Sequence, residues 1–104
     1  MKVFDTSKTF PPEEKYSLTD QIRRSSRSVC ANIGEAFRKR RYEKSFVAKL
    51  NDAEGEAAES QVWIELAQAN GYLSQETANG LYTAYDEVIG KLVTMSNQAD
   101  KWSL

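Results

Sequence analysis

Three long stretches of this chain repeat apolar residues every three or four positions, the spacing of one face of an α-helix. The first such face runs from Leu18 to Phe37, and its spacing predicts a helix over residues 18–40. Ser17 precedes this helix and Asp20 lies in its first turn, which predicts an N-cap at Ser17. A chain with this pattern buries its apolar faces by packing helices against one another, so a helix bundle is expected.

The other two stretches are of similar length. One runs from Phe46 to Ala67 and should end at Gly71, which can adopt the left-handed conformation that closes a helix. Ser74 should cap the last helix, whose apolar residues step alternately by four and three positions as far as Trp102. This heptad seam is typical of bundle cores, and it predicts one unbroken helix up to Trp102.

The segment before the first long helix is short. The run Phe10-Pro-Pro breaks the chain, and only nine residues, with Val3 and Phe4 apolar, precede it. We therefore expect an all-α, antiparallel, up-down bundle of the four-helix type with a short or truncated first helix, formed as one domain by residues 1–104. A stub in the place of a fourth helix leaves an apolar groove partly uncovered, which would favour self-association.

Composition removes most enzyme classes. The 104 residues include no histidine and one cysteine, Cys30, so the chain has neither a Ser-His or Cys-His nucleophile pair nor the ligands of a closed zinc site. No apolar run exceeds three residues, whereas a membrane-spanning helix needs about 20. We expect a cytoplasmic protein with no catalytic activity, no cofactor and no membrane contact. Cys30 lies beside the apolar face of its helix and is expected to be buried and inert.

Charge is divided unevenly along the chain. The whole chain carries a net −1, but residues 1–49 hold 12 Lys/Arg against 6 Asp/Glu, whereas residues 50–104 hold 2 against 9. The acids Asp52, Glu56 and Glu59 share one face of their helix. A metal site there is not expected, because the Glu-x-x-His elements of di-iron bundles require histidine. Opposed blocks of charge can bind an external polyanion or pair with each other.

The basic block supplies the candidate nucleic-acid-binding residues. These candidates are Arg23, Arg24, Arg27, Arg38, Lys39, Arg40, Arg41 and Tyr42. With helical residues placed about 100° apart, four arginines form a stripe roughly opposite the apolar face, namely Arg23, Arg27, Arg38 and Arg41. This stripe could follow the phosphates of RNA or DNA, and Tyr42 could stack on a base. The alternative is that these charges face solvent or pair with the acidic helix of the same or a neighbouring subunit.

Asn32 and Glu35 lie between the apolar face and the basic stripe, where a neighbouring helix can cover them. A covered carboxylate needs a partner, and Arg38 and Lys39 follow Glu35 at the three- and four-residue spacing of helical ion pairs. We expect Asn32 and Glu35 to fix the register of the helices or a contact between subunits. The two tryptophans are expected to serve as packing or interface anchors.

Several motifs resemble those of one bacterial family. They are the run Phe10-Pro-Pro-Glu-Glu-Lys-Tyr-Ser-Leu, the pair Leu18-Thr19-x-Gln21-Ile22-Arg23-Arg24 and Ala31-Asn32-Ile33-x-Glu35, and the run Gly71-Tyr72-Leu73-Ser74. In these motifs the chain is similar to the four-helix bundle proteins encoded in intervening sequences of 23S ribosomal RNA genes. The likeness extends from about Val3 to Trp102. The paired motif is its most specific part, because both of its halves match the family at the same spacing.

The resemblance implies a four-helix bundle that assembles into a ring, typically a pentamer, with no known catalytic activity. The family is similar in fold to the accessory variability proteins of diversity-generating retroelements, which are basic and bind nucleic acid and a reverse transcriptase. Members of the family usually carry a longer first helix than the one expected here.

Two functions are compatible with these observations. In the first, a non-enzymatic oligomer binds RNA or DNA through the basic stripe, and symmetry multiplies weak contacts. In the second, the chain is a ring-forming structural or protein-interaction scaffold with no nucleic-acid role. Its basic and acidic halves would then pair between subunits, and its groove would take another protein.

Overall fold

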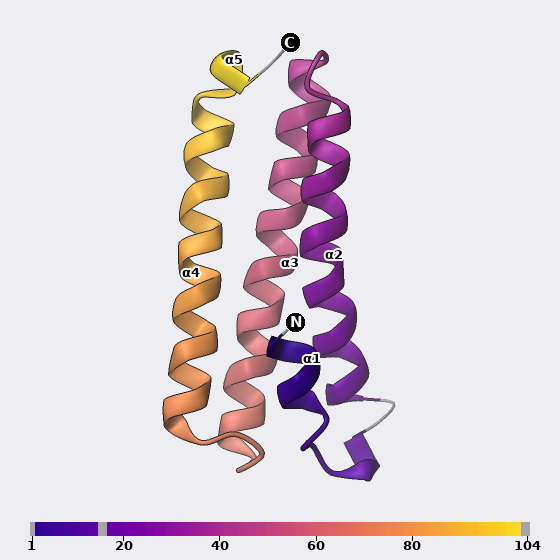
Figure 1. Cartoon of the computed structure of the whole chain (residues 1–104), viewed down its shortest axis with the longest axis vertical. Coiled ribbons are helices and arrows are strands. Elements are labelled where there is room, and N and C mark those ends of the chain that lie inside the picture. Colours follow the sequence, from indigo (N-terminus) through magenta and orange to yellow (C-terminus); the bar gives the residue numbers. More distant parts are fainter. Residues whose placement is uncertain (1, 15–16, 103–104) are drawn as a thin grey trace.

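The computed structural model describes residues 2–14 and 17–102, and every regular element in these ranges is a helix. The long helices are α2 (Leu18–Arg38), α3 (Glu43–Ala69) and α4 (Gln75–Asn97). The short elements are α1 (Lys2–Ser7), the 3₁₀ turn η1 (Pro12–Glu14) and α5 (Ala99–Trp102). As predicted, α2, α3 and α4 run antiparallel, and the bundle measures 45 × 24 × 17 Å (Figure 1). None of these helices is long and apolar enough to cross a membrane.

The middle helix of the bundle is α3, because α2 packs against one side of it and α4 against another. Its buried face carries Phe46, Leu50 and Ile64, with two buried alanines between Leu50 and Ile64. Small side chains allow neighbouring helices to approach closely. Midway along this face, Ser60 donates a hydrogen bond of 2.8 Å to Ser25 of α2, and both serines are fully buried.

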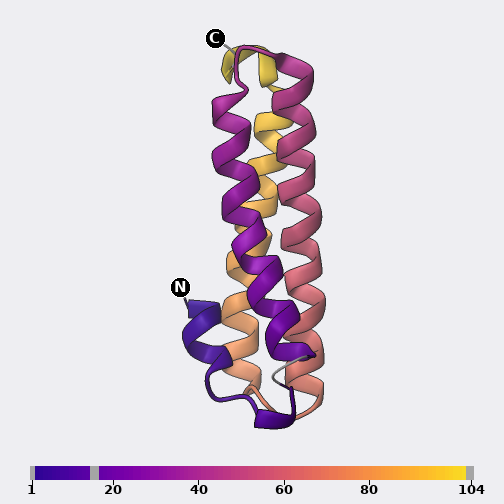
Figure 2. The same ribbon diagram turned by 90° about the vertical axis from the view of Figure 1, so that its right-hand side faces the viewer.

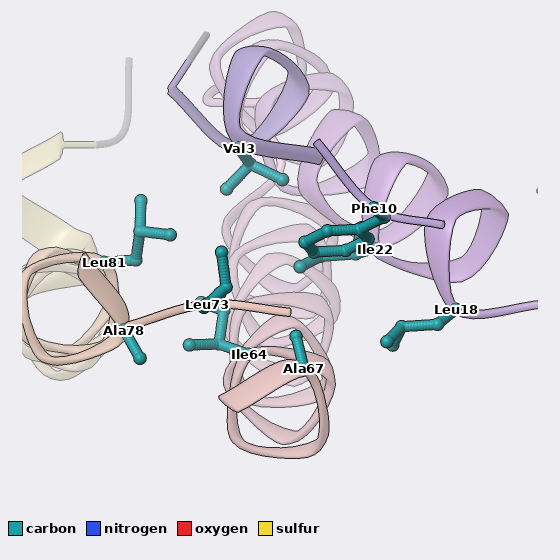
Figure 3. Close-up of a cluster of buried hydrophobic side chains, with 9 residues drawn as sticks. All are labelled: Val3, Phe10, Leu18, Ile22, Ile64, Ala67, Leu73, Ala78 and Leu81. Carbon is teal, nitrogen blue, oxygen red and sulfur yellow. The ribbon is translucent and has the colours of Figure 1, made fainter. Parts of the chain in front are cut away.

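One apolar cluster fills the end of the bundle where α1 lies. Val3 of α1 and Phe10 close over Ile22 of α2 and Leu81 of α4, and all four are buried (Figure 3). Figure 2 shows that α1 extends along only this part of the bundle. The fold is therefore a four-helix type with a short first helix, as the sequence predicts.

The predicted N-cap of α2 is wrong in one respect. Ser17 occupies the N-cap position, but its hydroxyl makes no hydrogen bond to the first turn of α2. It donates instead to Glu14, because the turn η1 places Glu14 beside it. Tyr72 also donates to Glu14, at 2.8 Å, and the hydrogen bonds from Ser17 and Tyr72 lower the pKa of this carboxyl. The Tyr72 hydrogen bond ties η1 to the loop between α3 and α4.

The end of α2 comes two residues earlier than predicted, at Arg38. Lys39 is its C-cap, and Arg40 Nε donates to the carbonyl oxygen of Phe37 at 3.1 Å. This bond satisfies one of the carbonyls that a helix leaves without a partner in its last turn. The chain then turns directly into α3, and we call residues 38–42 the joint.

The last helix is also interrupted, so the predicted unbroken seam is wrong beyond Asn97. Gln98 is the C-cap of α4, and α5 begins after it and packs on α3. The bend buries Ala99 and brings the Trp102 ring to 6.2 Å from the ring of Phe37 in α2. The break therefore closes this end of the bundle over its second apolar cluster.

The end of α3 and the start of α4 are as predicted. Gly71 has a φ of 78°, and the N–H groups of Gly71 and Tyr72 donate back to the last turn of α3 at 2.9 and 2.8 Å. This is the hydrogen-bond pattern of a helix that ends on a left-handed residue. The Ser74 hydroxyl accepts a hydrogen bond from the backbone N–H of Thr77 at 3.1 Å, which caps α4.

Replacing Gly71 with alanine is expected to lower the free energy of unfolding by about 1–2 kcal/mol, because an L residue is strained at positive φ. Gly55, inside α3 with open space where a Cβ would lie, provides the control. Gly55→Ala should raise the free energy of unfolding by about 0.5–1 kcal/mol. Urea unfolding at one protein concentration measures both variants, and a neutral Gly71→Ala would contradict the argument.

Candidate nucleic-acid interface

The candidate basic residues divide between α2 and the joint. Arg23, Arg27 and Arg38 lie on one side of α2, as the helical spacing predicts. Arg41 lies beyond the end of α2, so the predicted helical stripe is wrong at this position. The physical reason is the early end of the helix, which turns the backbone before Arg41.

Arg23 is engaged by α1. Its Nε donates to the Ser7 hydroxyl at 2.7 Å, and its guanidinium lies 4.3 Å from the centroid of the Phe4 ring. A cation over an aromatic face is attracted by the electrons of the ring. These contacts fix the short first helix to α2, so the role of Arg23 within one chain is structural.

Arg24 pairs with the acidic face of α3. One terminal nitrogen lies 2.6 Å from a Glu59 oxygen, and the other lies 3.3 Å from Glu56. The hydrogen bond between Arg24 and Glu59 raises the pKa of the arginine and lowers the pKa of the carboxyl. For Arg24, the structure shows the internal pairing that the sequence left open as the alternative.

The acidic face of α3 is thus partly neutralised within the chain. Glu56 and Glu59 contact Arg24, and Asp52 lies 3.7 Å from the Lys49 amine. Across the two described ranges, no three cysteine, aspartate or glutamate side chains are placed to hold a metal ion.

Two residues of the joint are held by neighbours in α2. The Lys39 amine lies 3.6 Å from Glu35, the ion pair that the four-residue spacing predicts. The Arg40 guanidinium lies over the Phe37 ring, 5.5 Å from its centroid, and its Nε donates to the Phe37 carbonyl. Each of the two side chains thus has a contact one turn back in the helix.

The remaining candidates are open to a ligand. Arg27, Arg38 and Arg41 are exposed, and none has an acidic partner within the described part of the chain. Tyr42, the N-cap residue of α3, is 63% exposed. The joint lies at the end of the bundle where α2 meets α3 (Figure 1). Its exposed side chains present positive charge and an aromatic ring there.

Two residues near the joint were not predicted as part of it. Lys44 is exposed in the first turn of α3, and its position beside the basic run is a signal that could have found it. Trp102 is 41% exposed and lies against Phe37. A straight last helix would have carried Trp102 elsewhere, so only the bend at Gln98 places it here.

Asn32 and Glu35 are less covered than expected. The Asn32 side chain is partly buried and donates to the carbonyl of Ser28 in its own helix at 2.9 Å. Glu35 is 48% exposed and lies 4.0 Å from Lys49 of α3, so it makes a loose link between the two helices. Within one chain, Glu35 is therefore only partly covered, by Lys49 of α3. A subunit contact here stays a prediction.

A groove of about 290 Å³ opens between α2 and α4, beside the first turn of α1. Apolar side chains line most of it, among them Val29 and Ile33 of α2 and Val88 of α4, in agreement with the predicted groove. Cys30 is exposed at this groove, so the prediction of a buried thiol is wrong. The reason is that Cys30 lies on the side of α2 that borders this open groove.

The fold and these surfaces define a small helical bundle protein of the four-helix type, with a basic end and an open apolar groove. Residues 1–94 match the model of a family described as 23S rRNA-intervening sequence protein. The chain belongs to this family, which confirms the resemblance seen in the motifs.

The fold has a counterpart among solved structures. A crystal structure of a protein with unknown function, from the S23 ribosomal protein family of Bacteroides thetaiotaomicron, is 29% identical to this chain. The two superpose with a TM-score of 0.81, and the match covers 90% of this chain and 87% of that chain. A comparison with curated proteins gives no match.

The pairing of Arg24 with Glu59 has a consequence for acid stability. Because the pKa of Glu59 is lower in the folded chain than in the unfolded chain, the pair stabilises the fold near neutral pH. This contribution is lost as the pH falls through the folded pKa. Glu59→Gln should lower the free energy of unfolding at pH 7 by about 0.5 kcal/mol, a modest value because both side chains are partly exposed.

Urea unfolding at pH 7, well above the usual glutamate pKa, and at about pH 3.5, below it, measures this effect. Glu59→Gln should show a smaller loss of stability between the two values than the native chain. Glu54→Gln, which removes a carboxylate without an ion-pair partner in the described residues, is the control. An unchanged pH dependence in Glu59→Gln would count against the pair.

Proposed function

We propose that this chain is a non-enzymatic, cytoplasmic RNA-binding protein and that the joint is its contact surface. The observation that supports this most is the exposure of Arg38 and Arg41, which have no acidic partner in the described chain, beside an exposed Tyr42. Arginines in this state can replace the counterions of a phosphate backbone. The absence of histidine argues against an enzyme, since it removes the commonest general acid and base.

The proposed surface differs from the stripe predicted on the second helix. Arg23 and Arg24 are held by α1 and α3, so their charge is less available to a ligand. Arg27 stays exposed on α2 and can extend the surface along the bundle. Lys39 and Arg40 contribute charge from positions that their own helix fixes.

The double variant Arg38→Gln with Arg41→Gln is expected to weaken binding of a fluorescein-labelled RNA hairpin by about tenfold at low salt. Two lost phosphate contacts should also reduce the slope of log affinity against log salt by about 1.4–1.8. Fluorescence anisotropy at several salt concentrations measures both quantities.

The matched control changes the net charge by the same amount at the opposite end of the bundle. Lys8→Gln with Gln75→Glu changes two exposed side chains, one just after α1 and one in the first turn of α4. This control should retain most of the affinity. Equal losses in the two double variants would mean that net charge, rather than the joint, determines binding.

The groove supports a second candidate function, a self-assembling scaffold. An apolar surface between α2 and α4 that one chain leaves open can be buried by association. The family resemblance favours a ring, with a pentamer as the expected size. Assembly is compatible with RNA binding, because a ring would repeat the joint in each subunit and raise avidity.

Ala84→Asp tests assembly through the groove, because Ala84 lines it but is exposed and so contributes little to the core of one chain. We expect this variant to be monomeric by light scattering, since assembly would bury an unpaired carboxylate. Ala58→Asp, at an exposed position of α3, is the control and should keep the mass of the native assembly. A monomeric native chain, or an unchanged mass in Ala84→Asp, would rule out this role for the groove.

A further inference from the structure

We infer that the joint end of the bundle prefers single-stranded RNA to duplex RNA, because it presents aromatic rings for unstacked bases beside its arginines. This inference rests on the proposed function and specifies its ligand. It depends on three features of this end: a line of packed rings that reaches the surface, an arginine held in place, and an exposed tyrosine.

A line of rings leads from the core to the surface. Phe46 of α3 is fully buried, and its ring lies 6.1 Å from that of Phe37 in α2. The Trp102 ring, nearer the surface, lies 6.2 Å from the Phe37 ring at an interplanar angle of 70°. This edge-to-face contact with Phe37 fixes the indole in place. Since Trp102 remains 41% exposed, part of its ring is open to a base.

Arg40 is held beside these rings. Its Nε is occupied by the carbonyl of Phe37, and its guanidinium lies over the Phe37 ring. The terminal nitrogens have no acceptor within the described residues and can donate to a phosphate. An arginine that is already ordered loses less conformational entropy on binding than a free one.

Tyr42 gives the same end a second aromatic surface. It is two residues from Arg40 and is 63% exposed, more than any other large apolar side chain in the described part of the chain. Its hydroxyl has no hydrogen-bond partner among the described residues. The packing of this chain does not require the ring to be here, since it covers little of the core.

Charge and rings act differently on the two forms of RNA. Arg38, Arg40 and Arg41 can contact phosphates of either form. In a duplex the bases stack on each other, and the A-form major groove is too deep and narrow for protein side chains to read. In a single strand each base offers a free face to an aromatic side chain, and such stacking adds affinity without requiring a particular sequence. Tyr42 and Trp102 should therefore strengthen binding of single strands alone.

The test compares two fluorescein-labelled probes by anisotropy at about 50 mM salt. One is an oligouridine of about 12 nucleotides, and the other is an RNA duplex of the same length. The native chain should bind the oligouridine about tenfold more tightly than the duplex. Tyr42→Leu should remove most of this preference and leave the affinity for the duplex unchanged, whereas Tyr42→Phe should retain it.

Phe4→Leu, which changes a partly exposed ring on α1, is the control and should bind both probes like the native chain. Circular dichroism verifies that each variant is folded. Equal affinity for the two probes, or an equal loss for both in Tyr42→Leu, would overturn this inference while leaving the arginine-dependent binding intact. If neither probe binds at low salt, the proposed function fails as well.

Discussion

The position of α3 between α2 and α4 is the constraint on which the rest of the structure depends. Ser60 of α3 bonds to the buried Ser25 of α2, whereas the buried Gln61 donates to the Tyr82 carbonyl and to Asp86 of α4, at 3.1 and 2.7 Å. A slip of one helix by a turn would leave these polar groups buried without partners, which is costly. Neighbouring residues of α3 thus fix its register against both other helices, and the groove lies between α2 and α4 where no full fourth helix separates them.

Much of this arrangement could be predicted from the sequence, because its signals are local. Apolar spacing defines the faces of the long helices, and the Gly71 turn and the Ser74 cap each depend on residues within one turn. The errors arise where contacts outside the helix determine how it begins or ends. Ser17 donates to Glu14, which also accepts a hydrogen bond from the distant Tyr72, instead of capping its own helix. The seam bends at Gln98, and α5 there buries Ala99 and reaches Phe37. No periodicity encodes those preferences.

The sequence identifies which basic residues could form the candidate site, but it does not show which of them are free to bind a ligand. Counting charges located the basic block, yet it could not separate Arg24, which α3 neutralises, from Arg38, which remains free of acidic partners in the described chain. That distinction depends on which side of α2 faces an acidic neighbour. The same is true of Cys30, whose place beside the apolar face suggested burial. Its exposure depends on which part of α2 borders the open groove, which helical spacing does not report.

The bend that brings α5 over the bundle links the joint to the order in which contacts can form during folding. Helices α2 and α3 are adjacent in sequence, so they can pack as a hairpin before more distant contacts form. Trp102 reaches Phe37 only when the chain has turned at Gln98 and α5 lies over this end of the bundle. A chain in which α5 has opened therefore keeps its basic turn and Tyr42 but loses the indole from this end.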